Sequence, residues 1–371
     1  MTVLHISGAR SWGGNEQQLM YLMDELPKYG VNQKLFCFQG TPIAEETKSK
    51  PVEILSTTYC KPHSSNYRKF LINIIENNKI DLIHLHTSDS VTGYVLTDLV
   101  HSLKTPTLFA RKGIRRKTSF LSRLKYNYHN IDTILCISKY VEKHFKKILT
   151  EKNKKKLVTV YNGVKISEKP LQSDFSIRDK FDIADETFLI GNIANHTNAK
   201  DLPVLIEVMN ELVNKQGIKK IKLFQIGEHS GLTPELEKKI NEYQLGNYII
   251  LAGFLPKASA YLSQFDVFLM TSEREGGPSS VVEAFYNKTP VVSTRVGVVD
   301  EVIDDGVNGF STEIKNPSAL AGKIMTLREH PELLKQFADK SYQMFLKKFT
   351  ADNLGKSTFE VYKNTLQKIK K

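Results

Sequence analysis

The chain of 371 residues has only three cysteines and no apolar run long enough to span a membrane. Because Cys37, Cys60 and Cys136 are an odd and scattered set, they predict neither a disulfide framework nor a metal site. A membrane-spanning helix needs about 18 consecutive apolar residues. The opening residues, MTVLHISGAR, lack the basic start and long apolar core of a secretion signal. Together these absences favour a cytoplasmic protein in a reducing compartment.

Acidic residues are also scarce relative to basic ones, since the formal net charge is +12. Residues 111–125 hold seven Lys or Arg and no acid, and residues 139–156 hold eight Lys against two Glu. One interpretation is that both segments contact an anionic membrane surface. The other is that they are solvated lysine-rich faces. The chain lacks a recognisable nucleic-acid recognition motif, so no nucleic acid is expected as a partner.

Short apolar segments alternate with helical patterns, which is typical of a parallel α/β architecture. In the order of the chain, the predicted strands are 3–7, 34–38, 82–85, 107–110, 133–137, 189–193, 222–226, 248–252, 266–271 and 290–294. Similar strand–loop–helix beginnings at Thr2 and Thr187 predict two Rossmann-like domains. A chain of this length is also more typical of two domains than of one.

The polar stretch between Val164 and Glu186 is the predicted boundary, which gives domains 1–163 and 164–351. We expect a substrate cleft between them, at the carboxyl ends of both sheets. A last helix at about 352–371 has an apolar stripe and two possible positions. It either crosses back onto the first domain or packs on the second.

Residues 266–286 (DVFLMTSEREGGPSSVVEAFY) predict a ligand site where a strand passes through a glycine loop into a helix. Pro278 suits the first helical turn, and Gly276 and Gly277 allow the backbone to approach a ligand. Main-chain N–H groups at the helix start would bind an anion such as a diphosphate, aided by the helix dipole. These groups belong to Ser279, Ser280 and Val281. The carboxylates of Glu275 and Glu283 could accept hydrogen bonds from sugar hydroxyls without a metal.

This segment resembles the retaining glycosyltransferases of family 4, which have the GT-B fold. Their pattern S-x-x-E-G-x-P followed by E-A is matched by Ser272, Glu275, Gly276, Pro278, Glu283 and Ala284. The resemblance implies that Glu275 contacts the donor sugar and Glu283 the ribose. The alternative is a pair of glutamates on a solvated helix face.

Further matches to the family follow in the expected order. The loop in IGNIANHTNAKDLPVLIEV resembles the one that holds the diphosphate, and Lys200 matches its phosphate-binding lysine. Asn195 stands where an arginine is usual. Gly253 and Phe254 resemble the segment that lines the base pocket, although Phe254 could instead belong to the core.

In the N-terminal half, the sequence Gly13–Gly14–Asn15–Glu16 resembles the family's G-G-x-E loop, which lies over the donor phosphates and near the acceptor. A tight structural turn is the alternative. His86 at a strand end either lines the cleft or is a satisfied structural histidine. Arg111 lies near the place where many relatives have a histidine, which implies a phosphate-facing or acceptor-facing role. The acceptor-side candidates are therefore Asn15, His86 and Arg111.

The resemblance implies transfer of a sugar, with retention, from a nucleotide diphosphate sugar to a glycan or lipid-linked acceptor of cell-surface polysaccharide or lipopolysaccharide. A UDP-sugar is preferred over a GDP-sugar, Glu275 and Lys200 are the catalytic candidates, and neither cofactor nor metal is expected. The protein would be cytoplasmic or peripheral at the inner face of the membrane. Three alternatives stay open: a nucleotide-sugar epimerase of related fold, a non-enzymatic nucleic-acid-binding protein, and an inactive nucleotide-sugar-binding homologue.

Overall fold

The computed structural model describes residues 1–114, 118–167 and 172–369. It consists of two compact units, the first formed by residues 1–165 with 350–371 and the second by residues 166–349. The divisions lie within two residues of the predicted boundaries. Among the described residues, no helix has both the length and the apolar character needed to cross a membrane.

Unit 1 is built on seven parallel strands in the order β3-β2-β1-β4-β5-β6-β7. Its strands are β1 (Thr2–Ile6), β2 (Asn32–Phe38), β3 (Glu53–Thr57), β4 (Leu82–Leu85), β5 (Thr107–Arg111), β6 (Thr133–Cys136) and β7 (Leu157–Thr159). Its helices are α1 (Gly14–Glu25), α2 (Pro42–Thr47), α3 (Ser65–Asn77), α4 (Ser88–His101), α5 (Phe120–Tyr126), α6 (Lys139–Lys146), α7 (Glu151–Lys154) and α15 (Ala351–Ile369).

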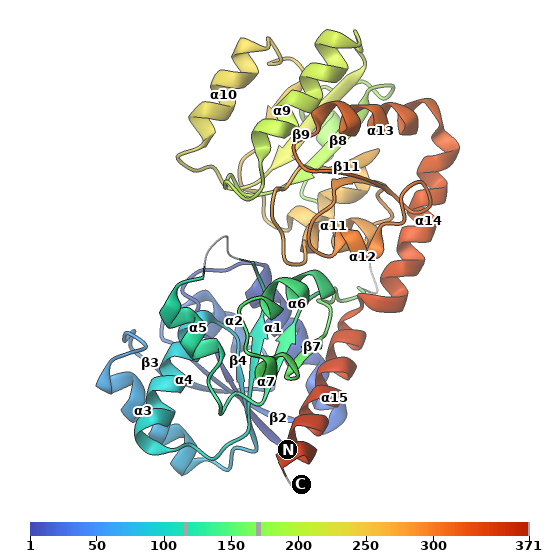
Figure 1. Cartoon of the computed structure of the whole chain (residues 1–371). Coiled ribbons are helices and arrows are strands. Elements are labelled where there is room, and N and C mark those ends of the chain that lie inside the picture. The colour runs from blue at the N-terminus through green and yellow to red at the C-terminus, as the bar shows by residue number, and fades with distance from the viewer. Residues whose placement is uncertain (115–117, 168–171, 370–371) are drawn as a thin grey trace. The chain divides into compact units, whose positions relative to one another are not determined.

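Both faces of this sheet are covered, because parallel strands joined by helices are buried on both sides. Helices α3 to α6 pack on one face, with Leu71, Tyr94 and Phe145 in the core. On the other face, α15 returns from the end of the chain to lie beside α1 (Figure 1). The fully buried Tyr362 is its central contact. The C-terminal helix therefore completes the first unit rather than the second.

Unit 2 is built on six parallel strands in the order β10-β9-β8-β11-β12-β13. Its strands are β8 (Phe188–Ile193), β9 (Ile221–Ile226), β10 (Ile249–Leu251), β11 (Val267–Met270), β12 (Val291–Thr294) and β13 (Phe310–Thr312). Its helices are α8 (Ile177–Lys180), α9 (Leu202–Asn210), α10 (Thr233–Glu242), α11 (Ser279–Tyr286), α12 (Val299–Val302), α13 (Pro317–Glu329) and α14 (Pro331–Lys348).

One face of the second sheet is covered by α9, α10 and α13 and the other by α11, which packs on α14 (Figure 1). The apolar residues at helical spacing that predicted α9, among them Leu205, Val208 and Met209, are buried in this core. In both sheets the chain runs outward from a central strand in one direction and then in the other. The all-parallel sheets confirm the predicted α/β class and its two Rossmann-like units.

This topology determines where a ligand can bind. Helices that follow neighbouring strands on opposite sides of the reversal leave a crevice at the carboxyl ends of those strands. The reversal lies between β1 and β4 in unit 1 and between β8 and β11 in unit 2. Most of the sequence motifs lie in the loops that follow these four strands, whereas Arg111 ends β5 and Gly253 and Phe254 follow β10.

Candidate functional site

In unit 2, the loops after β8 and β11 are joined directly. The carbonyl of Ala199 accepts hydrogen bonds from the main-chain N–H groups of Glu273 (2.9 Å) and Arg274 (3.3 Å). From the end of β11, Thr271 Oγ1 donates to the carbonyl of Lys200 at 3.2 Å. These bonds hold the two loops as one substructure, so the side chains that they carry have fixed relative positions.

Lys200 and Glu275 meet across this junction. Lys200 Nζ donates to Glu275 Oε1 at 2.6 Å, and Ser272 Oγ donates to the same oxygen at 3.0 Å. The two charged side chains are 26% and 13% exposed, so their ion pair is partly shielded from water. A charge-assisted hydrogen bond of this kind orients both groups.

Glu283 lies on α11 and belongs to the same region, because the charge of Lys200 acts on it. Burial raises the pKa of the Glu283 carboxyl to about 7, and Lys200 offsets part of that increase. The structure therefore brings together Lys200, Glu275 and Glu283, which are far apart in the sequence. The alternative of two glutamates on a solvated helix face does not describe this arrangement.

The start of α11 has the features of an anion site. Its N-cap is Pro278, and no side chain caps the helix, so the amides of its first turn are not used by a capping group. These amides belong to Ser279, Ser280 and Val281. Gly276 and Gly277 form the loop before them. Close by, a Cβ on Gly297 would lie 3.0 Å from the Cβ of Glu275, so only glycine leaves this loop undisturbed.

Two predicted residues have other surroundings. Asn195 is exposed, and its Oδ1 accepts a hydrogen bond from the main-chain N–H of Glu228 at 3.0 Å, which ties the loops after β8 and β9 together. Phe254 follows Gly253, whose φ is +72°, and its side chain is 70% exposed. The alternative that placed Phe254 in the core is therefore wrong. Its exposed ring can still contact a base.

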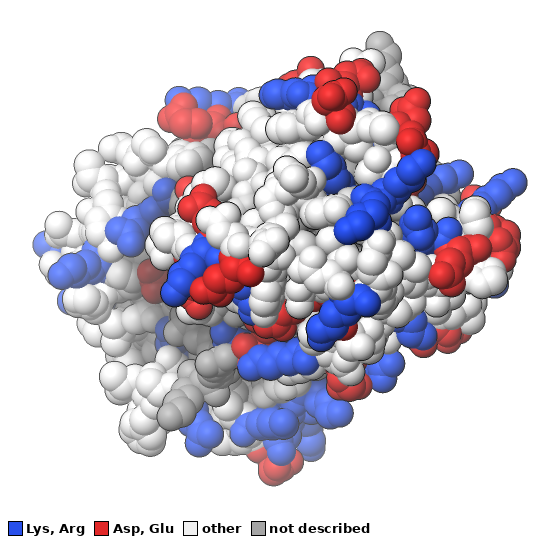
Figure 2. All heavy atoms as spheres, turned by 90° about the horizontal axis from the view of Figure 1, so that it is seen from above, with Lys and Arg blue, Asp and Glu red and all other residues white. Residues whose placement is uncertain are grey.

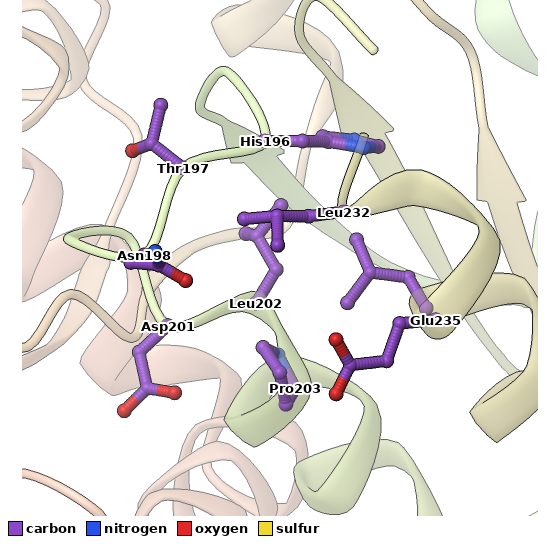
Figure 3. Close-up of a pocket in the computed structure, with 9 residues that line it drawn as sticks. His196, Thr197, Asn198, Asp201, Leu202, Pro203, Leu232 and Glu235 are labelled. Atoms are coloured by element: carbon purple, nitrogen blue, oxygen red, sulfur yellow. The ribbon is translucent and has the colours of Figure 1, made fainter. Parts of the chain in front are cut away.

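A small pocket opens on the other side of the loop after β8. Figure 3 shows His196, Thr197 and Asn198 on this loop, facing the beginnings of α9 and α10. The pocket has a volume of about 110 Å³, and its lining includes the carboxylates of Asp201 and Glu235. Acidic lining does not suit a diphosphate, and none of the lining residues belongs to α11.

In unit 1, the predicted glycine loop is held by the lysine that directly follows β5. Gly13 is the N-cap of α1, and Lys112 Nζ donates to the carbonyl of Asn15 at 3.0 Å. Burial lowers the pKa of Lys112 to about 8, and the nearby Glu16 carboxylate offsets part of that decrease. A poorly solvated cation therefore lies at the carboxyl edge of this sheet, together with Gly14 and Asn15.

His86 belongs to a buried cluster with His5 and His84. His5 Nε2 donates to Gln33 Oε1 at 3.2 Å, so its Nδ1 accepts from His86 Nε2 at 2.9 Å. This leaves His86 Nδ1 buried without a hydrogen-bond partner, and the same is true of His84 Nε2. Both histidines line a cavity of about 30 Å³, large enough for a bound water.

The donor atoms of the three histidines lie within 4.8 Å of one another, which raises the question of a metal. Both ring nitrogens of His5 are already used, and the charge of Lys112 acts on all three imidazoles. These conditions do not suit a cation. Burial lowers the pKa of His5 to about 4, and the pKa values of His84 and His86 are also lowered. His86 is thus a buried structural histidine with one ring nitrogen left over.

Arg111 is buried at the end of β5. Its guanidinium lies 5.5 Å from the ring of Tyr126 and 5.0 Å from that of Phe145. It also lines a second cavity in unit 1. Arg111 does not line the cavity next to His84 and His86. The basic residue that lines that cavity is Lys112.

In the described part of the two basic segments, some of the lysines are bonded within unit 1. Residues 115–117 of the first lie outside the described residues. Lys125 is bonded to Ser88 and Thr92 of α4, and Lys156 to the carbonyls of His129 and Ile131. Figure 2 shows one face of the molecule, on which Lys and Arg lie interspersed with Asp and Glu. Net charge by itself therefore does not define a docking surface.

Two functional candidates were missed at the sequence level. Lys112 appeared only as one charge in a basic run. Arg274 lies directly before Glu275, and its buried Nε has no hydrogen-bond partner. Arg274 is a second basic residue in the loop that leads to α11. It could supply the positive charge that was expected from an arginine at position 195, where this chain has Asn195. Its position inside the matched motif was the signal that could have identified it.

Two family models match the chain. "Glycosyl transferases group 1" matches residues 173–344, and "Glycosyltransferase Family 4" matches residues 12–168. Together the two matches cover most of both units.

Individual relatives agree with these models. An uncharacterised glycosyltransferase of Methanocaldococcus jannaschii is 28% identical over 319 residues, which are 81% of this chain and 83% of that protein. A poly(ribitol-phosphate) alpha-N-acetylglucosaminyltransferase of Staphylococcus aureus is 25% identical over 64% of this chain, but over only 45% of its own length. The crystal structure of Anabaena HepE with UDP and glucose has a TM-score of 0.81 at 17% identity, and the match covers 98% of this chain and all of that one.

Proposed function

Because the chain belongs to the group 1, or family 4, glycosyltransferases and has their GT-B fold, we propose that it transfers a sugar from a UDP-sugar to a glycan or lipid-linked acceptor. The acceptor would belong to a cell-surface polysaccharide or lipopolysaccharide. The preference for UDP over GDP is supported by HepE, whose structure contains UDP and glucose. The S. aureus relative, named for transfer to poly(ribitol phosphate), supports a cell-surface acceptor. The reaction would take place in the cytoplasm or at the inner face of the membrane.

The observation that carries this proposal is the contact of Lys200 with Glu275 at the uncapped start of α11. In this position a diphosphate would meet a lysine and main-chain amides, while the attached sugar would meet a carboxylate. An ion pair that is partly shielded from water adds little net stability, so a contribution to stability is a weak explanation for this pair.

We infer that the donor separates the ion pair. The β-phosphate would take the place of the Glu275 carboxylate as the partner of Lys200 Nζ, because a diphosphate carries more charge. Glu275, still held by Ser272, would then be free to accept hydrogen bonds from the sugar hydroxyls. Glu283 would accept from the ribose. The guanidinium of Arg274 is available for a second phosphate contact.

The chemical step would proceed with retention, by attack on the face from which the nucleotide leaves. The bond between the anomeric carbon and the phosphate oxygen breaks, and a bond from the acceptor oxygen to the same carbon forms. The acceptor's proton passes to an oxygen of the departing phosphate. Charge grows on the diphosphate during this step, so Lys200 and the amides of α11 stabilise the transition state more than the ground state. No metal or cofactor is required by this scheme.

The site is tested by a thermal-shift screen with UDP, GDP and their common sugars. We expect a UDP-sugar to raise the melting temperature of the wild type, and Glu275→Ala and Lys200→Ala to weaken that effect strongly. Lys220→Ala, which removes a surface lysine paired with Glu186, is the matched control. Equal stabilisation of the wild type and both site variants would contradict the assignment.

Mass spectrometry of the products separates the alternatives. A transferase needs an acceptor to form a sugar-bearing product, whereas an epimerase would release a modified nucleotide sugar without one. Donor binding without either product would indicate an inactive homologue. A protein that binds nucleic acid would show a salt-dependent gel shift instead.

A further inference from the structure

Two loops at the carboxyl edge of unit 1 meet at the end of β2. The loop after β1 carries Arg10 and the loop after β3 carries Tyr59, and the Arg10 guanidinium lies 5.1 Å from the centre of the Tyr59 ring. Tyr59 in turn lies edge-on to Phe38, the buried last residue of β2, with 5.0 Å between the ring centres. Because β2 lies between β1 and β3, the sheet itself supports this stack. Arg10 is therefore an exposed arginine with a fixed support.

The contact with Tyr59 leaves the Arg10 guanidinium able to bind an anion. A cation–π contact is satisfied by the charge of the guanidinium and does not use its N–H groups as hydrogen-bond donors. A planar guanidinium that is already supported loses less freedom when it binds an anion with two hydrogen bonds. Carboxylates and phosphates are the anions that match this geometry.

The same loop carries Trp12, the only tryptophan of the chain. Its side chain is 41% exposed, although tryptophan is highly buried on average. The Cα atoms of residues two positions apart are separated by at most about 7 Å, so one oligosaccharide can reach both Trp12 and Arg10. The loop is held at both ends. The Gly8 N–H donates to Thr87 Oγ1 at 3.2 Å, and Trp12 directly precedes the N-cap of α1.

The charges of this edge favour a negatively charged ligand. In their described parts, the loops after β1 to β5 contain the basic residues Arg10, Lys61 and Lys112 and no acidic residue. The acids closest to these loops in the sequence, Glu16 and Asp89, lie in the first turns of α1 and α4. The carboxylate of Glu16 acts on Lys112, which already bonds to a main-chain carbonyl. Arg10 is thus the exposed cation that remains for a ligand beside Trp12.

We propose that Arg10 and Trp12 bind an acceptor whose sugar or polyol units carry an anionic group. The anion would contact the Arg10 guanidinium, and the C–H face of a neighbouring unit would pack on the Trp12 indole. The inference rests on the transferase function proposed above, because it names the acceptor class of that function. Trp12 directly precedes the predicted glycine loop with the acceptor-side candidate Asn15, and this continuity supports the acceptor as the occupant.

The combination of the two side chains favours this occupant over simpler ones. Inorganic phosphate would use Arg10 but would leave the indole in water. A neutral glycan would cover the indole but would leave the guanidinium without an anion. A single-stranded nucleic acid also joins a flat face to a charge, but its binding sites usually stack successive bases on several aromatic side chains. Oligo(dT) is therefore included in the test.

Trp12 is its own reporter, since tryptophan emission from this chain comes from position 12 alone. The full chain is titrated with a ribitol-phosphate oligomer, an oligogalacturonate, neutral maltohexaose and oligo(dT). We expect an anionic glycan or polyol to shift the emission to shorter wavelength, with an affinity that falls as salt is added. The tighter of the two anionic oligomers identifies phosphate or carboxylate as the preferred group. No response to either at millimolar concentration, or tighter binding of maltohexaose or oligo(dT), would overturn the proposal.

Matched variants test the arginine. Arg10→Gln should weaken binding of the preferred anionic oligomer about tenfold and leave the weak binding of maltohexaose unchanged, because a charge-assisted hydrogen bond is lost. Tyr59→Leu, which removes the support of Arg10, should cause part of the same loss. Arg123→Gln removes another exposed arginine of unit 1 and should have little effect. Equal losses from Arg10→Gln and Arg123→Gln would contradict the proposal.

The tryptophan is tested by calorimetry, which needs no fluorescent side chain. Trp12→Ala should weaken binding of the anionic oligomer and of maltohexaose, because both lose the same apolar face. Phe120→Ala is the control, since Phe120 is an aromatic residue of the same unit that is 73% exposed. Unchanged binding of the anionic oligomer by Trp12→Ala would refute the role of the indole.

Kinetics separate this inference from the transferase function. With a donor identified by the thermal-shift screen, Arg10→Gln should raise KM for the anionic acceptor and leave kcat nearly unchanged, because Arg10 binds the acceptor away from the reacting atoms. If the anionic oligomer binds at Trp12 but receives no sugar, the transferase function fails and the binding site stands. If wild type and Arg10→Gln transfer sugar equally well to neutral and anionic acceptors, the binding site fails and the function stands.

Discussion

Each unit has a lysine and a glutamate at the carboxyl edge of its sheet. In unit 2 the lysine is the residue that follows the first strand, and in unit 1 it is the glutamate. In unit 2, Lys200 follows the first strand and Glu275 follows its neighbour, and the two form an ion pair at 2.6 Å. In unit 1, Glu16 follows the first strand, and Lys112 follows β5 and bonds to a main-chain carbonyl instead. Lys200 of unit 2 is thus paired with a carboxylate that a ligand can displace. Lys112 of unit 1 instead holds a loop in place.

The environments differ in a second way. Burial raises the pKa of an acid, Glu283, in unit 2, and lowers the pKa of bases, Lys112 and His5, in unit 1. Burial thus favours the neutral form of an acid at the candidate site of unit 2 and of bases near the sheet edge of unit 1. One unit suits a ligand that carries an anion and hydroxyl groups, and the other has a neutral core beneath a cationic edge.

The largest effect is expected from removing the lysine of unit 2. Lys200→Met should lower kcat about 10²- to 10³-fold, because one donor to the developing charge of the leaving group is lost. Lys112→Met should lower it only about tenfold, since that amine positions a loop. Steady-state rates with the donor identified by the screen measure both.

Lys220→Met is the control for loss of a surface charge, and its rate should be unchanged. If Lys112→Met were the more damaging of the two, the roles assigned to the units would have to be exchanged.

The second effect is a pH dependence of opposite sign in the two units. The pKa of His5 in the folded protein, about 4, lies below its ordinary value of 6.5. The contribution of the neutral His5 ring to stability is therefore complete above pH 6.5 and is lost as the pH falls toward 4. The folded pKa of Glu283, about 7, lies above its ordinary 4.5, so its contribution is present below pH 4.5 and is lost as pH rises through 7. Each shift corresponds to about 3 kcal/mol at most.

Hydrogen exchange in graded urea, followed on peptides from β4 and β11, measures the free energy of opening for each unit separately. Between pH 4.5 and 6.5 we expect acidification to destabilise unit 1 and to stabilise unit 2. Glu283→Gln should reduce the slope in unit 2 alone, and His5→Asn should reduce it in unit 1 alone. Slopes of the same sign in both units would refute the contrast.

A smaller effect is expected from Ser272→Ala. Its hydroxyl bonds to the Glu275 carboxylate, and a hydrogen bond to a charged group contributes about 1.5 kcal/mol, which corresponds to a loss of roughly tenfold in kcat/KM. Ser173→Ala, which removes a hydroxyl bonded to Gln264, is the control in the same unit. A rate unchanged by Ser272→Ala would show that Ser272 does not position Glu275 in the donor complex.

The same contrast explains what the sequence could predict. The central strands were identified because they are continuous apolar runs buried on both faces, such as Leu82–Leu85. Three strands were missed, and all three are edge strands: β3, β7 and β13. The first two are only partly buried, and the third is three residues long with two hydroxyl side chains. An edge strand needs less apolar surface, so its pattern is weaker.

The candidate site shows the same limit. The helix start and the pair Glu275 and Glu283 lie within one short segment, so their spacing could be interpreted directly. Lys112 and Asn15, by contrast, are 97 residues apart, and His5 and His86 are 81 residues apart. Their contacts depend on the order of the strands, which local patterns do not specify. The left-handed backbone of Asp201 had no sequence signal at all.

Asp201 provides the smallest effect and a direct comparison of the units. Its φ is +48°, its buried Oδ2 has no hydrogen-bond partner, and burial raises the pKa of its carboxyl. In unit 1, Ser102 has the same φ of +48° but is exposed at the end of α4. Glycine relieves left-handed strain at either site, and at Asp201 it also removes a poorly solvated carboxyl group. Urea unfolding should therefore show a gain of about 1 kcal/mol for Asp201→Gly and only a few tenths for Ser102→Gly. A loss of stability in Asp201→Gly would mean that the Asp201 carboxylate, which lies at the N-cap of α9 beside the pocket of Figure 3, stabilises the start of that helix by more than its burial costs.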